Sequence, residues 1–230
     1  MMQLDARLAA IAAFVPAGMS FADIGGDHAY LAAALIKDGH APRAVVGDLS
    51  AGACAAARRT VEARVLADRI AVRQGDGLSV LVPGEAEAVV IAGMGGALIV
   101  QILAQSPDVL AHVKALVLQP MNAGAKLRAW LYENGWHTAD ETLARAGGRI
   151  YEVIRAERGH AAMPADVFLH VGEKLLARRD PLLRAFVAEK LEKLRRAASG
   201  MERGASARTS AAYSAVLERI EALEGVLKTV

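Results

Sequence analysis

Three aspartates follow apolar runs of the sequence at positions where they could bind a nucleoside. Asp23 lies near the end of "SFADI", Asp48 ends "RAVVGD", and Asp76 follows "IAVRQG". A carboxylate in the position of Asp48 can accept hydrogen bonds from both hydroxyls of an adenosine ribose, and one in the position of Asp76 can accept from the exocyclic amine of adenine. A solvated loop explains any one of these aspartates equally well, but three in succession favour a nucleoside site.

The glycines that follow Asp23 do not fit a dinucleotide-binding turn. That turn reads Gly-x-Gly-x-x-Gly, whereas the frame from Gly25 places Asp27 and Tyr30 at the second and third glycine positions. A pyrophosphate would meet the carboxylate of Asp27 there. A cofactor with a cationic centre and no phosphate would not be repelled, and S-adenosyl-L-methionine is such a molecule.

A second glycine cluster, "IAGMGG", is not a dinucleotide site either. The frame from Gly93 gives Gly95 but then Leu98, and no acidic residue lies between Asp108 and Glu133, where a partner for the ribose is expected. We therefore predict that this cluster is the loop after a fourth strand. That loop faces the acceptor in methyltransferases, and its glycines allow a flat base to approach the backbone closely.

A parallel sheet would bring these segments together. Apolar runs alternate with helical patterns, which predicts a doubly wound, Rossmann-like α/β sheet. The predicted strands cover residues 20–24, 43–48, 70–76, 87–93 and 115–120. A helix over residues 4–15 precedes them. Two glycines, Gly147 and Gly148, predict the turn of a closing antiparallel hairpin within residues 136–157.

The pattern becomes purely helical from about Met163. Asp180 followed by Pro181 predicts the start of a helix. Apolar residues at spacings of three and four then predict an antiparallel, coiled-coil-like hairpin, with Gly200 and Gly204 between its helices. The predicted seams are Leu183, Val187, Leu191 and Leu194 on the first helix and Val216, Ile220, Leu223 and Leu227 on the second. We predict two domains, residues 1–160 and residues 161–230.

Composition and charge restrict the class of protein. The 230 residues suffice for one domain and a small appendage, and the net charge of +2 combines an acidic excess before residue 145 with a basic excess after it. The single cysteine, Cys54, excludes an intrachain disulfide and predicts a cytoplasmic protein. No apolar run is long enough for a membrane span, Asp5 argues against a signal peptide, and the scattered histidines predict no metal site.

Several motifs in this order resemble one enzyme family. "FADIGGDHAYL", "GDGL", "IAGMGG", "LQP" followed by "LRAWL", and "YEVI" are similar to the bacterial tRNA (adenine-N1)-methyltransferases of the TrmK type, which modify adenine at position 22. The similarity covers nearly the whole chain, including the C-terminal helical hairpin. It implies S-adenosyl-L-methionine as the cofactor and tRNA as the substrate.

The resemblance also implies a set of site residues. The cofactor-binding residues would be Asp23, Gly25, Gly26, Asp27, His28, Asp48, Leu49, Gly75, Asp76, Gly77, Ala92 and Gly93. The catalytic candidates are Asp27, His28, Met94 and Asn122, and Gly95 and Gly96 would meet the acceptor base.

Methylation of N1 creates a cation, so Asp27 could stabilise the product charge while His28 positions the reactants. The family commonly reads Gln-Pro-Asn, but this chain reads Gln119, Pro120, Met121. Asn122 would then act from a shifted position, or another residue takes its role.

Cations of the helical hairpin could bind the phosphates of RNA. The candidates that we assign to substrate binding are Arg178, Arg179, Lys190, Lys193, Arg195 and Arg196, and Lys174, Arg203 and Arg208 add to the same cluster. A solvated helix face explains any single one of these charges.

Three functions remain open from the sequence. The first is a tRNA adenine-N1 methyltransferase, the second a methyltransferase for another RNA or a small molecule, and the third a non-catalytic RNA-binding protein. A nicotinamide-dependent enzyme is a distant fourth. The sequence leaves the oligomeric state open between a monomer and a weak dimer.

Overall fold

The computed structural model describes residues 4–202 and 210–230, which form two compact units, Met1–Met163 and Pro164–Val230. The predicted domain boundary at residue 160 lies close to this division. Gly204, Arg203 and Arg208, which the sequence analysis singled out, lie outside the described residues.

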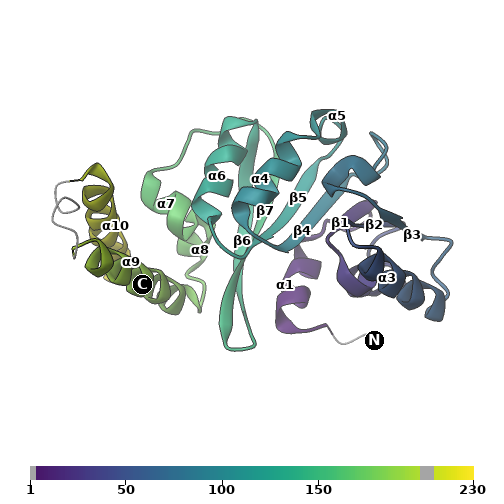
Figure 1. The fold of residues 1–230 in the computed structure, drawn as a ribbon, viewed down its shortest axis with the longest axis horizontal. Helices are drawn as coiled ribbons and strands as arrows, with labels where there is room; N and C mark the ends of the chain where they lie inside the picture. Colours follow the sequence, from purple (N-terminus) through teal and green to yellow (C-terminus); the bar gives the residue numbers. More distant parts are fainter. Residues whose placement is uncertain (1–3, 203–209) are drawn as a thin grey trace. The chain divides into compact units, whose positions relative to one another are not determined.

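The first unit is built on one seven-stranded sheet (Figure 1). Its strands are β1 (Phe21–Ile24), β2 (Ala44–Asp48), β3 (Ile70–Gln74), β4 (Ala88–Met94), β5 (Ala115–Pro120), β6 (Trp136–Ala146) and β7 (Arg149–Arg158). Their order is β3-β2-β1-β4-β5-β7-β6, with the first five parallel to one another and β7 antiparallel to both β5 and β6. The prediction of a doubly wound sheet with a closing hairpin is confirmed.

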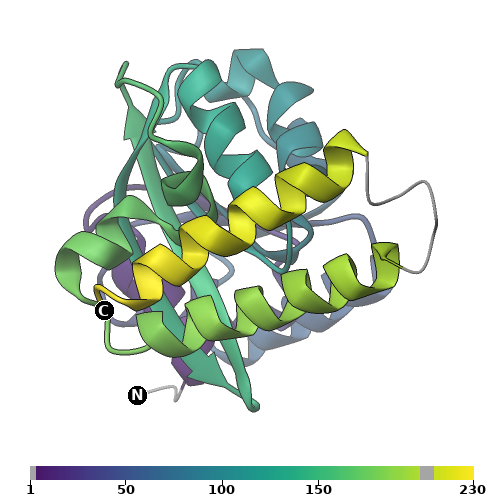
Figure 2. The same cartoon turned by 90° about the vertical axis from the view of Figure 1, so that its left-hand side faces the viewer.

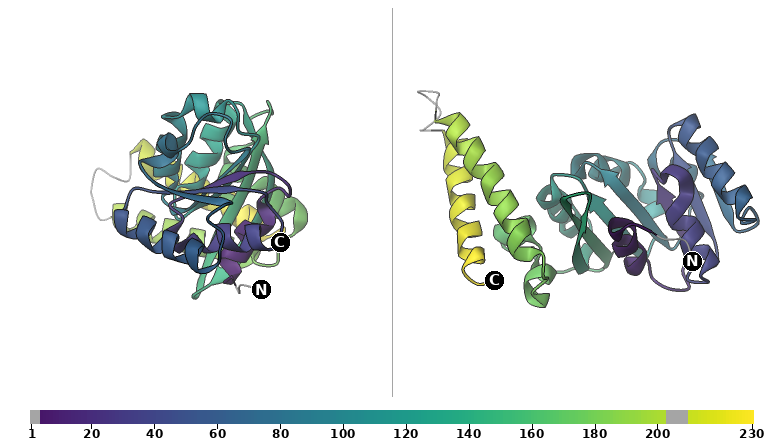
Figure 3. Two further views of the ribbon diagram at one scale, coloured as in Figure 1. Left: turned by 90° about the vertical axis from the view of Figure 1, so that its right-hand side faces the viewer. Right: turned by 90° about the horizontal axis from the view of Figure 1, so that it is seen from below.

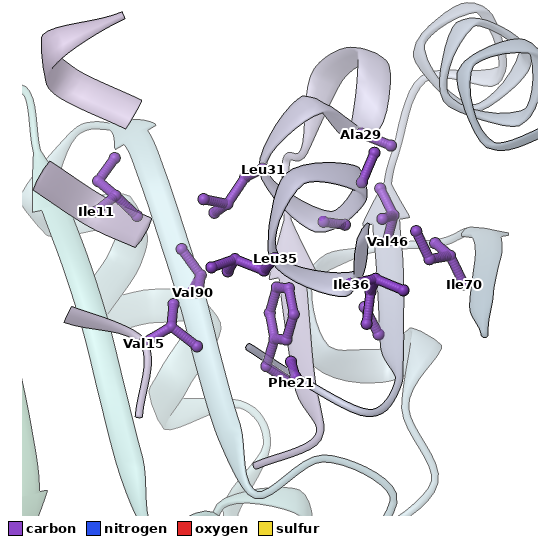
Figure 4. Packing of buried hydrophobic residues seen from close by; sticks show 14 of the residues in the cluster. Ile11, Val15, Phe21, Ala29, Leu31, Leu35, Ile36, Val46, Ile70 and Val90 are labelled. Atoms are coloured by element: carbon purple, nitrogen blue, oxygen red, sulfur yellow. The ribbon is translucent and has the colours of Figure 1, made fainter. Parts of the chain in front are cut away.

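Alternating strand residues separate two hydrophobic cores. In β1, Phe21 packs into the core under α1 (Ala6–Phe14), α2 (Tyr30–Lys37) and α3 (Ala51–Ala63), and Ala22 faces the opposite core. Figure 4 shows Ile11, Leu35 and Val90 of the first core close together. The second core lies under α4 (Gly96–Ala104), α5 (Pro107–Leu110) and α6 (Gly124–Glu133). Burial on both faces explains why the central strands read as continuous apolar runs.

Side chains at the helix starts fix where several helices begin. The carboxylate of Asp5 accepts a hydrogen bond from the Leu8 N–H at 2.7 Å, and the hydroxyl of Ser50 accepts one from the Ala53 N–H at 3.3 Å. The Asp5 cap fixes the first turn of α1, and residues of this helix reach the sheet. On α3, Cys54 is buried, with its Sγ 3.5 Å from the Asp48 and Arg73 carbonyl oxygens.

The second unit is entirely helical among its described residues. It contains α7 (Asp166–Val171), α8 (Glu173–Arg178), α9 (Leu183–Met201) and α10 (Ala211–Leu227). The two long helices run side by side in opposite directions (Figure 2; Figure 3, right panel). Most of the predicted seam is buried or half-buried, with Val187 and Leu223 almost inaccessible to solvent. The predicted antiparallel hairpin is confirmed.

The predicted start of the first long helix is wrong by two residues. The carboxylate of Asp180 accepts a hydrogen bond from the Leu182 N–H at 2.9 Å, and the Leu183 N–H donates to the Asp180 carbonyl. These bonds form a turn that contains Pro181, and regular helix begins only at Leu183. The Asp-Pro pair therefore marks the turn before the helix rather than its first residues.

Candidate functional site

The loop after β1 is shaped by residues in left-handed conformations. Gly25, His28 and Ala29 have φ values of 73°, 62° and 54°. Gly26 lies directly against Asp23, because a Cβ at Gly26 would be 2.6 Å from the Asp23 Oδ2. The loop therefore closes over Asp23 near the end of β1. This close approach requires that residue 26 has no Cβ, as in glycine.

Asp23 is a buried carboxylate. Its exposed fraction is 5%. Burial raises the pKa of Asp23 from 3.8 to about 7, and the positive charge of Arg7 opposes that rise. No residue within 4–202 or 210–230 donates a hydrogen bond to this carboxylate. Such a group favours a cationic hydrogen-bond donor as its partner.

A cavity of about 380 Å³ lies beside Asp23, at the ends of β1 and β4. The order of parallel strands reverses between β1 and β4, and ligands of doubly wound folds bind at such a point. The cavity is lined by Arg7, Leu8, Asp23, Gly25, Gly26, Asp27, His28, Tyr30, Leu31, Ala92 and Gly93. Its lining is polar on the side of Arg7, Asp23 and Asp27.

A second cavity of about 170 Å³ lies over the ends of β2 and β3. It is lined by Ile24, Gly25, Asp48, Leu49, Gly75, Asp76, Gly77, Met94, Leu98 and Ile102. Leu49, Leu98 and Ile102 supply apolar surface, whereas Asp48 and Asp76 supply carboxylates. This mixture suits a flat purine and its ribose.

The two cavities share Gly25, and Met94 lies at this junction. A Cβ at Gly25 would collide with the terminal methyl of Met94. Every residue predicted to bind the cofactor lines one cavity or the other. The structure thus brings the predicted set together at one edge of the sheet, and the role of each residue stays a prediction.

Asp27 and His28 lie at the mouth of the first cavity. The Nε2 of His28 is 3.5 Å from the Oδ1 of Asp27, and both side chains are largely exposed. The rings of His28 and Tyr30 stack, with their centroids 5.2 Å apart and their planes 8° from parallel. The stacking orients His28 and leaves the Asp27 carboxylate accessible to a ligand.

The loop after β5 packs against the glycine cluster after β4. The Met121 N–H donates to the Met94 carbonyl at 2.8 Å, and the Gly96 N–H donates to the Asn122 carbonyl at 3.0 Å. A Cβ at Gly95 would be 3.1 Å from the Asn122 Oδ1. The shifted asparagine therefore lies beside Gly95, at the edge predicted to meet the acceptor, while the Met121 side chain is partly exposed.

The site also contains residues that the sequence analysis missed. Arg7 of α1 donates from Nη1 to the Oε1 of Gln119 at 3.1 Å, and the Gly93 N–H donates to the same oxygen at 3.1 Å. The Cζ of Arg7 lies 5.8 Å from the centroid of the Tyr151 ring. Gln119 belongs to the "LQP" motif and could have been noticed, but no local pattern around Arg7 indicates that α1 reaches the end of β1.

The cations predicted to bind RNA lie in the second unit. Arg178 and Arg179 are at the end of α8, and the others are on α9. Arg195 pairs with Glu224 at 2.7 Å and Arg196 with Glu192, while the Nζ of Lys190 lies 4.4 Å from the Phe186 ring centroid. Much of this positive charge is therefore already in contact with other side chains of the same unit.

Two kinds of feature are absent from the described residues. No group of three or more His, Cys, Asp and Glu there could hold a metal ion. No helix in that part of the chain is both long and apolar enough to cross a membrane.

One protein family matches most of the chain. The family described as "TrmK: tRNA (adenine(22)-N(1))-methyltransferase" matches residues 21–225. The tRNA (adenine(22)-N(1))-methyltransferase of Bacillus subtilis is 42% identical over 158 residues, which cover 69% of this chain and 66% of the relative. The matched segment thus spans about two thirds of the length of this relative.

Solved structures cover almost the whole chain. The crystal structure of the B. subtilis m1A22 tRNA methyltransferase TrmK has a TM-score of 0.90 and 32% identity, and the match covers 99% of this chain and 100% of that one. A putative tRNA (m1A22) methyltransferase from Streptococcus pneumoniae, in complex with S-adenosyl-L-methionine, has a TM-score of 0.88 and 31% identity. That match covers 98% of this chain and 100% of the other.

Proposed function

The chain belongs to the TrmK family of tRNA (adenine(22)-N(1))-methyltransferases, and on this premise we propose that it transfers a methyl group from S-adenosyl-L-methionine to N1 of adenine 22 in tRNA. One observation carries the proposal. The family match coincides with two adjoining cavities that gather every predicted cofactor residue at the ends of β1 to β4. The relative from S. pneumoniae, with the same fold, was solved with this cofactor.

The residues of the two cavities fit the cofactor. Gly26 lets the loop after β1 lie directly against Asp23, where any Cβ would collide with that carboxylate, and the acidic strand ends exclude a phosphate but admit a sulfonium. We assign Asp48 to the ribose hydroxyls, because its carboxylate lies at the end of β2 and is only partly buried. We assign Asp76 to the adenine amine, and Leu49 and Leu98 to the faces of the ring.

The bound cofactor supplies a methyl group activated by a positively charged sulfur. The chain's residues have to align the adenine nitrogen with that methyl, since N1 already carries a lone pair and needs no general base. We assign this alignment to Met94, Gly95, Gly96 and Asn122, which lie together where the loops after β4 and β5 meet. The carboxylate of Asp27, at the cavity mouth, stabilises the positive charge that the methylated base acquires.

The helical unit is our candidate for contacts to the tRNA backbone. Basic residues outnumber acidic ones after residue 145, and phosphate contacts give RNA-binding proteins most of their affinity. We place the reaction in the cytoplasm, where a single thiol stays reduced.

Methyl transfer from labelled S-adenosyl-L-methionine to tRNA transcripts tests the proposal. Transcripts with adenine at position 22 should be methylated, and matched transcripts with guanine there should not. Asp48→Ala should weaken cofactor binding by about 10- to 100-fold, the value of hydrogen bonds to a charged acceptor. Asp68→Ala is the matched control, because Asp68 is exposed and precedes β3 at the opposite edge of the sheet.

Two outcomes would contradict the proposal at different points. If the cofactor binds and no tRNA is methylated, the substrate is another RNA or a small molecule. If methylation does not depend on adenine 22, the enzyme class stands and the target position is wrong.

A further inference from the structure

The first cavity contains a positive and a negative group that do not pair with each other. Arg7 is the only Lys or Arg among the described residues that line it, and the buried Asp23 belongs to the same lining. The charge of Arg7 acts on Asp23, but the two side chains form no salt bridge. A ligand with both charges could therefore contact each of them.

The head of Arg7 is held in place by a buried glutamine. The side chain of Gln119 is inaccessible to solvent, and its amide is fixed at both ends. Its Oε1 accepts from the Gly93 N–H, and its Nε2 donates to the Pro120 carbonyl at 3.1 Å. The same Oε1 accepts from the Nη1 of Arg7 at 3.1 Å. Arg7 is thereby positioned by the backbone at the ends of β4 and β5.

Most donors of Arg7 remain available to a ligand. A guanidinium has several N–H donors in a planar fork, which matches the geometry of a carboxylate. Gln119 is the only acceptor of an Arg7 hydrogen bond among the residues that the structure describes, and the Arg7 Cζ lies over the Tyr151 ring at 5.8 Å from its centroid. Arg7 also lines the cavity, where a ligand can meet its remaining donors.

We infer that Arg7 binds the α-carboxylate of the methionine part of S-adenosyl-L-methionine, while Asp23 accepts hydrogen bonds from its α-ammonium group. The inference rests on the proposed function and extends it to a binding residue of α1. The opposite charges fit this zwitterionic end, whereas the second cavity has the apolar surface that the adenine needs. Gly25 and Met94 lie between the two subsites, where the sulfonium would be.

Calorimetric binding of two ligands separates this role from general support of the cavity. S-adenosyl-L-methionine carries the carboxylate, and decarboxylated S-adenosylmethionine lacks it but keeps the amine. Arg7→Met should weaken binding of the first ligand by about 10- to 100-fold and change binding of the second less than about twofold. Arg43→Met is the matched control, because Arg43 is exposed and directly precedes β2. It therefore lies at the end of the strands opposite the two cavities.

Arg7→Lys is a second variant that keeps the charge and loses the fork. Its loss of affinity should be smaller and confined to the ligand with the carboxylate. If an Arg7 variant weakens both ligands equally, or weakens neither, the inference is overturned. If the wild-type protein does not bind S-adenosyl-L-methionine at all, the proposed function itself fails. That result is distinct from failure of the inference alone, in which the wild-type protein binds both ligands alike.

Discussion

At the scale of single residues, Asp23 shows how the site opposes the stability of the fold. A buried aspartate with a pKa of about 7 binds a proton in the folded protein at pH values where the unfolded chain has released it. Stability therefore falls as the pH rises from about 4 to about 7, and the loss persists above pH 7. The fold keeps a destabilising carboxylate at the place where a cationic ligand would need it.

Asp23→Asn should stabilise the ligand-free protein at pH 8 and leave it almost unchanged at pH 4. The gain should be on the order of a few kcal/mol, because the pKa gap between folded and unfolded states sets its upper limit. Urea unfolding at the two pH values measures the effect. Asp68→Asn is the control, since that side chain is exposed. An equal gain at both pH values would mean that the charge of Asp23 is not the cause.

Residue types at strand ends made much of the site predictable. Asp23, Asp48 and Asp76 follow apolar runs, and parallel strands bring such ends to one edge. Arg7 was not predictable in this way, since its position depends on how α1 packs on the sheet rather than on its neighbours in sequence. Gln119 holds Arg7 across a separation of 112 residues, and local patterns carry no information on such a contact.

At the scale of secondary-structure elements, a buried group of three charges joins α6 to the hairpin of β6 and β7. Arg128 of α6 is 2.6 Å from the carboxylate of Glu141 and 2.8 Å from that of Glu152, and all three side chains are at most 7% exposed. Gly124, the first residue of α6, lies so close to Glu152 that a Cβ there would collide with its carboxylate. The group thereby fixes the start of α6, two residues after Asn122.

Arg128→Met should destabilise the protein by about 3–5 kcal/mol at pH 7, because it leaves two carboxylates buried without their cation. Urea unfolding at pH 7 measures this. The triple variant Arg128→Met, Glu141→Gln, Glu152→Gln removes all three charges and should be more stable than the single variant. A triple variant that is less stable would show that the individual contacts, rather than the unpaired charge, decide.

Elements were predicted well wherever a pattern was local. The five parallel strands and the turn at Gly147 and Gly148 lie where apolar runs and glycines indicated them. The group around Arg128 was not predicted, because its partners lie on strands that follow α6 and the sequence does not show which charges become buried. The start of α9 was misplaced because Asp-Pro also favours a turn, and the Leu182 N–H completes that turn.

At the scale of the whole molecule, the candidate cofactor site and the basic helices belong to different units. The first unit contains both cavities, and the second contains the basic helices. Substitutions in the basic helices should therefore change the electrostatic binding of tRNA without changing cofactor binding.

Replacing Arg179 and Lys193 together with Gln should raise the KM for tRNA and leave the Kd for S-adenosyl-L-methionine unchanged. Each lost phosphate contact should reduce the slope of log affinity against log salt by about one. Methyl-transfer kinetics measure the KM, filter binding across a salt series measures the slope, and calorimetry measures the Kd. Lys37→Gln with Arg59→Gln is the control, since both cations are exposed on helices of the first unit. Equal salt slopes for wild type and variant would remove these residues from the RNA interface.

Labelling of the Cys54 thiol can report local opening of the structure around α3. It is the only thiol in the chain, and it is buried beneath α3 against the carbonyl oxygens of Asp48 and Arg73. A thiol reagent can react with it only when that helix moves away from the ends of β2 and β3, so the labelling rate follows the population of the opened state. A ligand bound at Asp48 should slow that labelling in proportion to its occupancy. Binding to the first unit can thus be followed in the unmodified protein, with no engineered probe.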